Sequence, residues 1–158
     1  MAIAEVCPVP HTPLDILNAR HRRRESVLAE MVACASRAGA VRDAELLLET
    51  LAVRERLGAT SLGKGVAIPH AHSIAVLRSW HGIARSHVGI EWRAPDELPV
   101  QLVWLVLTPS ELSDEQHLRR VSSAAAALRL QRQRQRLHQA TDAGAAVRLL
   151  QEWNQWTP

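Results

Sequence analysis

The chain has 158 residues, of which 47% are hydrophobic and 22% charged, and its formal net charge is +3. This length and composition fit one globular domain and exclude a disordered, fibrous or collagen-like chain. Its aromatic residues are five Trp, with no Phe and no Tyr. Stacking surfaces for single-stranded bases are therefore scarce, which disfavours a nucleic-acid-binding protein despite the positive charge.

Cysteine usage and the apolar runs indicate the compartment. Cys7 and Cys34 are too few for a disulfide framework and form no close metal-ligand pair, which is typical of free thiols in a reducing compartment. The longest apolar run, Leu98–Leu107, has about half the length of a membrane helix. Three prolines among the first 13 residues leave no apolar stretch of the kind found in a secretory signal. We therefore expect a cytoplasmic protein that does not contact the membrane.

The first third of the chain predicts a tail, a short strand and two helices. Residues 1–13 are expected to form an extended N-terminal tail, and residues 14–158 a single domain. Ile16–Ala19 is a candidate for a short first strand. Apolar residues then recur at helical spacing from Glu25 until Gly39, which is a favourable C-cap. A second helix is predicted from Asp43, a good N-cap, to Gly58.

The middle of the chain predicts strands. Short apolar pieces stand among glycines between Gly58 and Ala71. Because Pro69 lacks an N–H group, we expect His70 in a turn just beyond a strand end. The further strands predicted are Trp80–Val88, Ile90–Trp92 and Val100–Leu107. The last of these is almost continuously apolar, as expected for a strand that is buried on both faces.

Two C-terminal helices are predicted, from Asp114 to His138 and from Asp142 to Trp153, and the first could fray where the QRQRQR stretch begins at Gln131. Helices, then strands, then helices again indicate an α/β fold in which a mixed β-sheet is sandwiched between helices. Trp80, Trp92 and Trp104 are expected in the core. Trp153 and Trp156 are expected to cover a helix end or an interface.

Residues 54–71, RERLGATSLGKGVAIPHA, are the best candidate for a chemical site. A neutral imidazole has a free lone pair, so His70 can act as a nucleophile. If His70 accepts a phosphoryl group, Arg54 and the glycine loop could supply cationic and backbone donors to its oxygens. Spacing alone favours a plainer interpretation, in which His70 faces water and Arg54 stabilises carbonyls at a helix end.

This segment resembles the active-site signature of the fructose- and mannitol-type enzyme IIA domains of the bacterial sugar phosphotransferase system, particularly of their nitrogen-regulatory relatives. That signature is an Arg-Glu-Arg/Lys helix end, a Gly-Ser/Thr loop, and Gly-x-Gly-apolar-Ala-apolar-Pro-His. Downstream, LPVQLVWLVLTP resembles the central strand of the family, and QHLRRVSSAAAALR resembles its His-Leu helix start. The resemblance spans about residues 14–153 and fixes several residue types over a long stretch.

The resemblance implies the mannitol/fructose-type IIA fold and a phosphocarrier of the phosphoenolpyruvate-dependent system. His70 would accept a phosphoryl group from the histidine phosphocarrier protein, Arg54 would stabilise the phosphoryl oxygens, and His117 would lie beside His70. No metal and no cofactor are implied. The protein would be a phosphoryl carrier, not an enzyme with several substrates. A regulatory role is expected, because the chain shows neither a transporter segment nor an attached carrier domain. The downstream partner would be a regulatory protein or a IIB domain.

Three residues depart from the family pattern. Lys64 lies between two glycines where many relatives have a neutral polar residue, and His72 adds an imidazole two positions after His70. Gln116 stands where relatives commonly carry an acid, which would leave His117 less well oriented or less basic. We expect these differences to affect the rate and the partner of phosphorylation more than the fold.

Other sites were weighed against these residues. His70 and His72, with His81 and His87, could be metal ligands, but Pro69 is expected to make this segment a turn and no Cys or carboxylate completes a tetrahedral set. The arginines at 20–24 and 129–136 could bind nucleic acid, although a solvated helix face is the commoner role of such residues. Two alternative functions stay open: a degenerate IIA-like domain that binds a regulatory protein without phosphotransfer, and an Arg-rich nucleic-acid-binding module.

Overall fold

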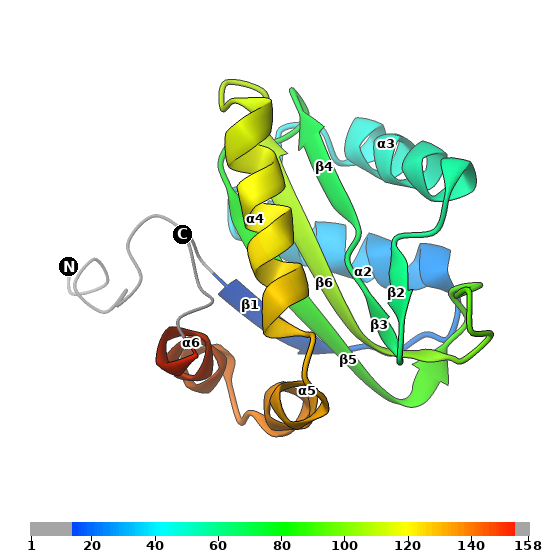
Figure 1. The fold of residues 1–158 in the computed structure, drawn as a ribbon. Helices are drawn as coiled ribbons and strands as arrows, with labels where there is room; N and C mark the ends of the chain where they lie inside the picture. The colour runs from blue at the N-terminus through cyan, green and yellow to red at the C-terminus, as the bar shows by residue number, and fades with distance from the viewer. Residues whose placement is uncertain (1–13, 154–158) are drawn as a thin grey trace.

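A computed structural model describes residues 14–153, which form one mixed β-sheet covered by helices on both faces (Figure 1). The predicted fold class is therefore confirmed. The elements in chain order are β1 Leu14–Asn18, α2 Arg24–Arg37, α3 Ala44–Leu57, β2 Ser61–Gly63, β3 Val66–Ala67, β4 His70–Ser73, β5 Trp80–Ile90, β6 Val100–Pro109, α4 Asp114–Ala127, α5 Gln131–Gln139 and α6 Ala143–Glu152. The predicted tail, residues 1–13, and Trp156 lie outside the described residues. The assignment of residues 14–158 to a single domain stays a prediction.

The sheet has six strands, with β6 near its centre. Its hydrogen-bonded order is β1-β5-β6-β3-β2, and β4 also pairs with β6. β5 runs antiparallel to β6, whereas β3 and then β4 run parallel to it along the other edge. Because β6 has neighbours on both edges and helices over both faces, its sequence is apolar almost throughout.

Alternate residues of β6 face two separate cores, because side chains along a strand point to opposite faces. The first core lies under α2 and α3 and includes Val103, Leu105 and Leu107. The second lies under α4, α5 and α6 and includes Leu102, Trp104 and Val106. His70 is in register with Val106, and His72 with Thr108, so both histidines face the α4 layer.

Side chains cap the starts of α3 and α4, and Asp142 caps the start of α6. The Asp43 side chain accepts a hydrogen bond from the Leu46 backbone N–H, at 3.0 Å, which confirms this residue as the N-cap of α3. Ser113 and Gln116 form a reciprocal capping box at the start of α4. Gln116 therefore helps to fix the first turn of the helix that carries His117, and its effect on that imidazole stays a prediction.

The prediction that His70 lies in a turn is wrong, because His70 is the first residue of β4. Pro69 lacks an N–H group, but its carbonyl accepts a hydrogen bond from the Val106 backbone N–H, at 3.0 Å. A proline can precede a strand without loss when only its carbonyl is needed for pairing. The other strands were predicted more closely, although β5 runs without a break from Trp80 to Ile90, so the separate strand predicted at Ile90–Trp92 is wrong.

The helix predicted from Asp114 to His138 is two helices, α4 and α5. Leu128 and Leu137 are both buried in the second core. They are nine residues apart, and at about 100° per residue they would face opposite sides of one continuous helix. The break between α4 and α5 lets both leucines face the sheet, although no Gly or Pro marks it in the sequence.

Trp80, Trp92 and Trp104 are at most 1% exposed, so their predicted core positions are confirmed. Within residues 14–153, no helix combines the length and the apolar character that crossing a membrane requires.

Candidate functional site

His70 is held at the start of β4, where its ring is partly exposed. Its Nδ1 lies 2.8 Å from the carbonyl oxygen of Ile68. A carbonyl oxygen can only accept a hydrogen bond, so Nδ1 carries the proton of the neutral ring. The lone pair is then on Nε2. The backbone around Pro69 thus selects the tautomer in which Nε2, and not Nδ1, can act as a nucleophile.

His117 projects from the first turn of α4 toward the same side of the sheet. Its ring centroid lies 5.5 Å from that of His70, with an interplanar angle of 48°. The side chain is 7% exposed, and its Nδ1 lies 2.8 Å from the Thr108 hydroxyl at the end of β6. The structure therefore brings together two of the three predicted site residues. Thr108 escaped the sequence analysis, although it is a polar residue that closes an apolar strand.

His72 adds a third imidazole to this cluster. Its ring stacks on that of His117, with centroids 5.1 Å apart and an interplanar angle of 20°. Its Nε2 lies 2.8 Å from the Leu112 carbonyl, and its Nδ1 lies 3.1 Å from the Asp114 carboxylate. Both contacts join β4 to the residues that lead into α4. His72 thus lies in the site and links β4 to the start of α4.

The argument against a metal site from a turn at Pro69 is wrong, because His70 and His72 lie on one face of a strand. Nevertheless, within residues 14–153 no three His, Cys, Asp or Glu side chains are grouped so that they could hold a metal ion. His81, on β5, instead accepts a hydrogen bond from the Trp104 indole, at 3.0 Å, and its burial lowers its pKa to about 3.

Burial lowers the pKa of His117 to about 4, and the nearby His70, His72 and Arg120 act in the same direction. Arg120 comes from α4 and donates to the Ser79 hydroxyl. Burial also lowers the pKa of Arg120, which nonetheless keeps its charge as a guanidinium. At neutral pH, His117 is therefore an uncharged ring that can donate one hydrogen bond to an anion beside His70.

The low pKa of His117 predicts a pH-dependent stability. Between about 6.5 and about 4 the unfolded chain binds a proton that the folded His117 does not, so the free energy of unfolding decreases as the pH falls through this window. The His117 contribution to the loss is at most about 3.5 kcal/mol, at about 1.4 kcal/mol per pKa unit.

Denaturant unfolding across this pH range measures the effect. We expect His117→Asn, whose amide can keep the contact with Thr108, to lose less stability on acidification than the wild type does. His81 contributes the same sign in both proteins and so cancels from the comparison. Parallel decreases in the two proteins would show that His117 is not the group responsible.

Arg54 lies in the last turn of α3, on the surface. Its guanidinium donates a hydrogen bond to the Gly58 carbonyl, at 2.7 Å, as the plainer interpretation of the sequence expects. Within residues 14–153 no hydrogen bond or ion pair joins it to His70. The loop it holds is nevertheless linked to the site, because the Thr60 carbonyl accepts from the Ile68 N–H, at 3.1 Å. Ile68 is the residue whose carbonyl holds the His70 ring.

Glu55, between the two arginines of the motif, is a buried carboxylate that the sequence analysis did not single out. It accepts hydrogen bonds from the backbone and hydroxyl of Thr60 and from the Trp92 indole, and it lies 3.7 Å from Arg24. Glu55 therefore fixes the path of the loop between α3 and β2. Its position next to charged residues on an exposed helix end gives little hint of this burial.

The family model described as "Phosphoenolpyruvate-dependent sugar phosphotransferase system, EIIA 2" matches residues 15–153. The PTS system fructose-specific EIIA component of Haloferax volcanii is 31% identical over 131 residues, which are 82% of this chain and 84% of that protein. The PTS system fructose-specific EIIABC component of Bacillus subtilis is 28% identical over 86% of this chain, and the match spans only 21% of that longer protein.

Two solved structures have the same fold. The nitrogen regulatory protein IIA-Ntr from Neisseria meningitidis superposes with a TM-score of 0.77 and 27% identity, covering 95% of this chain and 99% of that one. The enzyme IIA for mannitol from Escherichia coli, solved in complex with phosphorylated enzyme IIB, superposes with a TM-score of 0.72. At 19% identity over 87% of this chain and 94% of that one, it supports the fold alone.

Proposed function

This chain belongs to the EIIA 2 family of the phosphoenolpyruvate-dependent sugar phosphotransferase system, and we propose that it is a phosphocarrier that accepts a phosphoryl group on Nε2 of His70 from the histidine phosphocarrier protein. The observation that carries the proposal is the bond from His70 Nδ1 to the Ile68 carbonyl, at 2.8 Å. It leaves the other ring nitrogen with a lone pair on a partly exposed ring.

The proposed step is a transfer between two imidazoles. The lone pair of His70 Nε2 forms a bond to phosphorus as the bond from phosphorus to the donor's ring nitrogen breaks. The electron pair of the broken bond returns to the donor ring, so no net proton is needed. The phosphorylated ring of His70 gains positive character, and its Nδ1–H bond to Ile68 then becomes charge-assisted. In-line positioning and charge stabilisation supply most of the catalysis in such a transfer.

His117 lies where its Nε2 can donate a hydrogen bond to a phosphoryl group on His70, whereas both ring nitrogens of His72 are already engaged by the Leu112 carbonyl and the Asp114 carboxylate. Because the low pKa of His117 keeps its ring neutral, it adds no fixed charge to the site. Arg54 would contribute the cation that neutralises the phosphoryl oxygens. This role requires its guanidinium to leave or share the Gly58 carbonyl, a contact that lies at the exposed surface and is open to exchange.

Arg54→Ala is expected to slow phosphoryl transfer by roughly tenfold to a hundredfold, because it removes a bidentate donor to the developing charge. Arg56→Ala is a matched control, since Arg56 is an exposed arginine in the same helical turn. Single-turnover transfer from the phosphorylated carrier measures both variants. Equal rates for Arg54→Ala and the wild type would remove Arg54 from the site.

The proposal is tested by mixing the protein with phosphoenolpyruvate, enzyme I and the histidine phosphocarrier protein and recording the intact mass. We expect one phosphoryl group per chain. It should be lost in mild acid and stable in base, which is the behaviour of phosphohistidine. If no phosphoryl group is taken up while a regulatory partner still binds, the degenerate IIA-like module is the better description. Binding to DNA or RNA that weakens steeply with salt would instead favour the Arg-rich nucleic-acid-binding module.

The proposal includes a downstream partner and a location. The partner would be a IIB domain or a regulatory protein, and the resemblance to IIA-Ntr favours a regulatory role of the nitrogen-related type. Phosphorylation would change docking directly, because it places about two negative charges on the surface where the partner binds. A cytoplasmic location fits the free thiol of Cys34.

A further inference from the structure

Two hollows meet on the α4 and α5 side of the sheet. The first, of about 430 Å³, lies between the β2–β3 turn and the second half of α4. The second, of about 360 Å³, lies between the same turn and α5. Both are lined by Lys64 and Arg134, so the two hollows adjoin at these residues and are here named together the Lys64 cleft. His70 and His117 do not line it.

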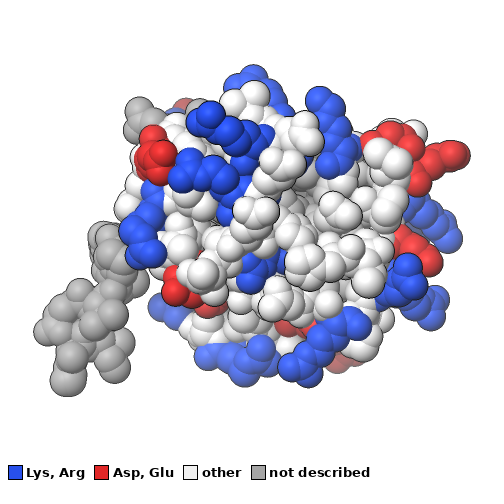
Figure 2. Space-filling model, turned by 90° about the horizontal axis from the view of Figure 1, so that it is seen from below, with Lys and Arg blue, Asp and Glu red and all other residues white. Residues whose placement is uncertain are grey.

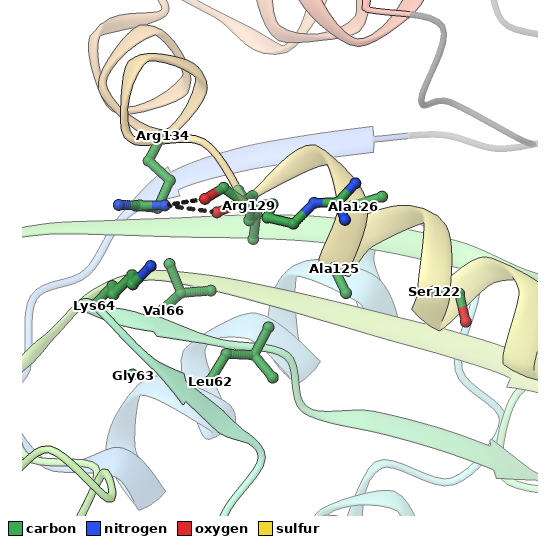
Figure 3. Close-up of a pocket in the computed structure, with 10 residues that line it drawn as sticks. Leu62, Gly63, Lys64, Val66, Ser122, Ala125, Ala126, Arg129 and Arg134 are labelled. Atoms are coloured by element: carbon green, nitrogen blue, oxygen red, sulfur yellow. Dashed lines mark hydrogen bonds between the residues drawn. The ribbon is translucent and has the colours of Figure 1, made fainter.

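The two halves of the Lys64 cleft differ in chemistry. Apolar side chains line most of the first hollow, among them Leu62, Val66, Ala125 and Ala126 (Figure 3). The second is lined mainly by carboxamides and imidazoles, among them Gln101, Gln131, Gln135 and His138. Within residues 14–153, no Asp or Glu side chain lines either half. The underside of the molecule, where α5 and α6 lie, also shows more Lys and Arg than Asp and Glu surface (Figure 2).

Lys64 enters the cleft from a strained turn. Its φ is +57°, between Gly63 and Gly65, whose φ values are +79° and +78°. Glycine adopts this left-handed conformation freely, whereas a residue with a side chain adopts it at a cost. The turn is held by Asp96, whose carboxylate accepts from the Lys64 backbone N–H, at 2.8 Å. The only lysine of the chain thus stands at a position that favours glycine, with its side chain in the cleft (Figure 3).

Arg134 faces Lys64 across the cleft and is already oriented. One terminal nitrogen of its guanidinium donates to the carbonyls of Leu128 and Arg129, at 2.9 and 2.8 Å (Figure 3). A guanidinium has five N–H donors, so it can hold the end of α4 and also bind an anion. The first turn of α5 contains no acidic residue, and its N-cap, Leu130, provides no side-chain cap. The positive end of this helix therefore adds to the potential around Gln131.

We propose that the Lys64 cleft binds a small phosphate ester with a short apolar group. The phosphate lies between Lys64 and Arg134, with glutamine amides as further donors, and the apolar group covers Leu62 and Val66. Two cations and several amide donors match the three oxygens of a phosphate better than the two of a carboxylate. The inference does not depend on phosphotransfer at His70, because neither His70 nor Arg54 takes part in this binding.

Monobutyl phosphate is a suitable probe, and amide chemical shifts of the ¹⁵N-labelled full chain report where it binds. We expect saturable shifts at Lys64, Gln101 and Gln131, and binding about tenfold tighter than that of inorganic phosphate, since the butyl group adds apolar contact. Equal affinity for the two probes would overturn the assignment of the apolar half. Binding to phosphatidic-acid vesicles without binding of free monobutyl phosphate would also contradict the proposal, because it indicates a membrane surface.

Lys64→Gly removes the ammonium group and keeps the turn, because glycine prefers this backbone conformation. We expect it to weaken monobutyl phosphate binding by about tenfold or more, at a thermal stability equal to or above that of the wild type. Arg42→Gln removes the same charge from the exposed connection between α2 and α3, on the opposite layer, and should leave binding unchanged. Wild-type affinity of Lys64→Gly would exclude Lys64 from the site, and equal weakening by Arg42→Gln would show that the protein attracts phosphate only through its net charge.

Discussion

His70→Asn is expected to lower the rate of phosphoryl uptake by more than about a thousandfold, while the protein remains folded. The asparagine amide can take the place of Nδ1–H and donate to the Ile68 carbonyl, so the local hydrogen bond survives. What the variant lacks is the lone pair of Nε2. The substitution therefore separates the nucleophile from the structural role of the ring more cleanly than alanine does.

The control for His70→Asn is His21→Asn, which alters an exposed histidine near Glu30 at the start of the chain. It should take up phosphoryl groups at the wild-type rate. Rapid-quench transfer from the phosphorylated histidine phosphocarrier protein measures both variants. Acid-labile phosphoryl groups on His70→Asn would mean that another residue is the acceptor, and His117 and His72 would be tested next.

Glu55→Ala is expected to lower the free energy of unfolding by about 3 to 5 kcal/mol, because it breaks a buried charged network and leaves its partners unpaired. Those partners are the Thr60 backbone and hydroxyl, the Trp92 indole and the nearby Arg24 guanidinium. Glu55→Gln should cost less, since it keeps one acceptor oxygen and the side-chain volume.

Urea unfolding measures these losses, and Glu49→Ala is the matched control because Glu49 is an exposed acid on the same helix. Its effect should be within about 0.5 kcal/mol of zero, as for other exposed substitutions. A Glu55→Ala protein as stable as Glu49→Ala would contradict the view that Glu55 anchors the loop before β2. The phosphoryl transfer rate of Glu55→Gln then reports whether a misplaced loop also disturbs His70.

The layered architecture was predictable because the apolar patterns are strong. β6 is nearly continuous in apolar residues, and α2 and α3 carry helical spacing with a matching N-cap at Asp43. The QRQRQR stretch predicted only fraying from Gln131, and the full break of the helix follows from the joint burial of Leu128 and Leu137 and not from a local stop signal. A tertiary requirement overrode a good local helical pattern there.

The site was predictable in part. The motif around His70 and the helix start at His117 could be recognised, and the structure brings these two rings within 5.5 Å. The place of His72 in the site was missed, because it depends on the pairing of His72 with Thr108 between β4 and β6. Pro69 made a strand at this point unexpected. The burial of Glu55 was also missed. It depends on Trp92, which is distant in sequence, and on Thr60, which lies on the other side of a loop.

The chemical form of the phosphorylated protein tests the central claim most directly. Nitrogen-15 NMR of the histidine rings, recorded after phosphorylation by the histidine phosphocarrier protein, identifies the residue and the ring nitrogen that hold phosphorus. The structure predicts phosphorus on Nε2 of His70, with Nδ1 still protonated and bonded to Ile68. Phosphorus on Nδ1 of His70, on His72 or His117, or on no histidine would contradict it.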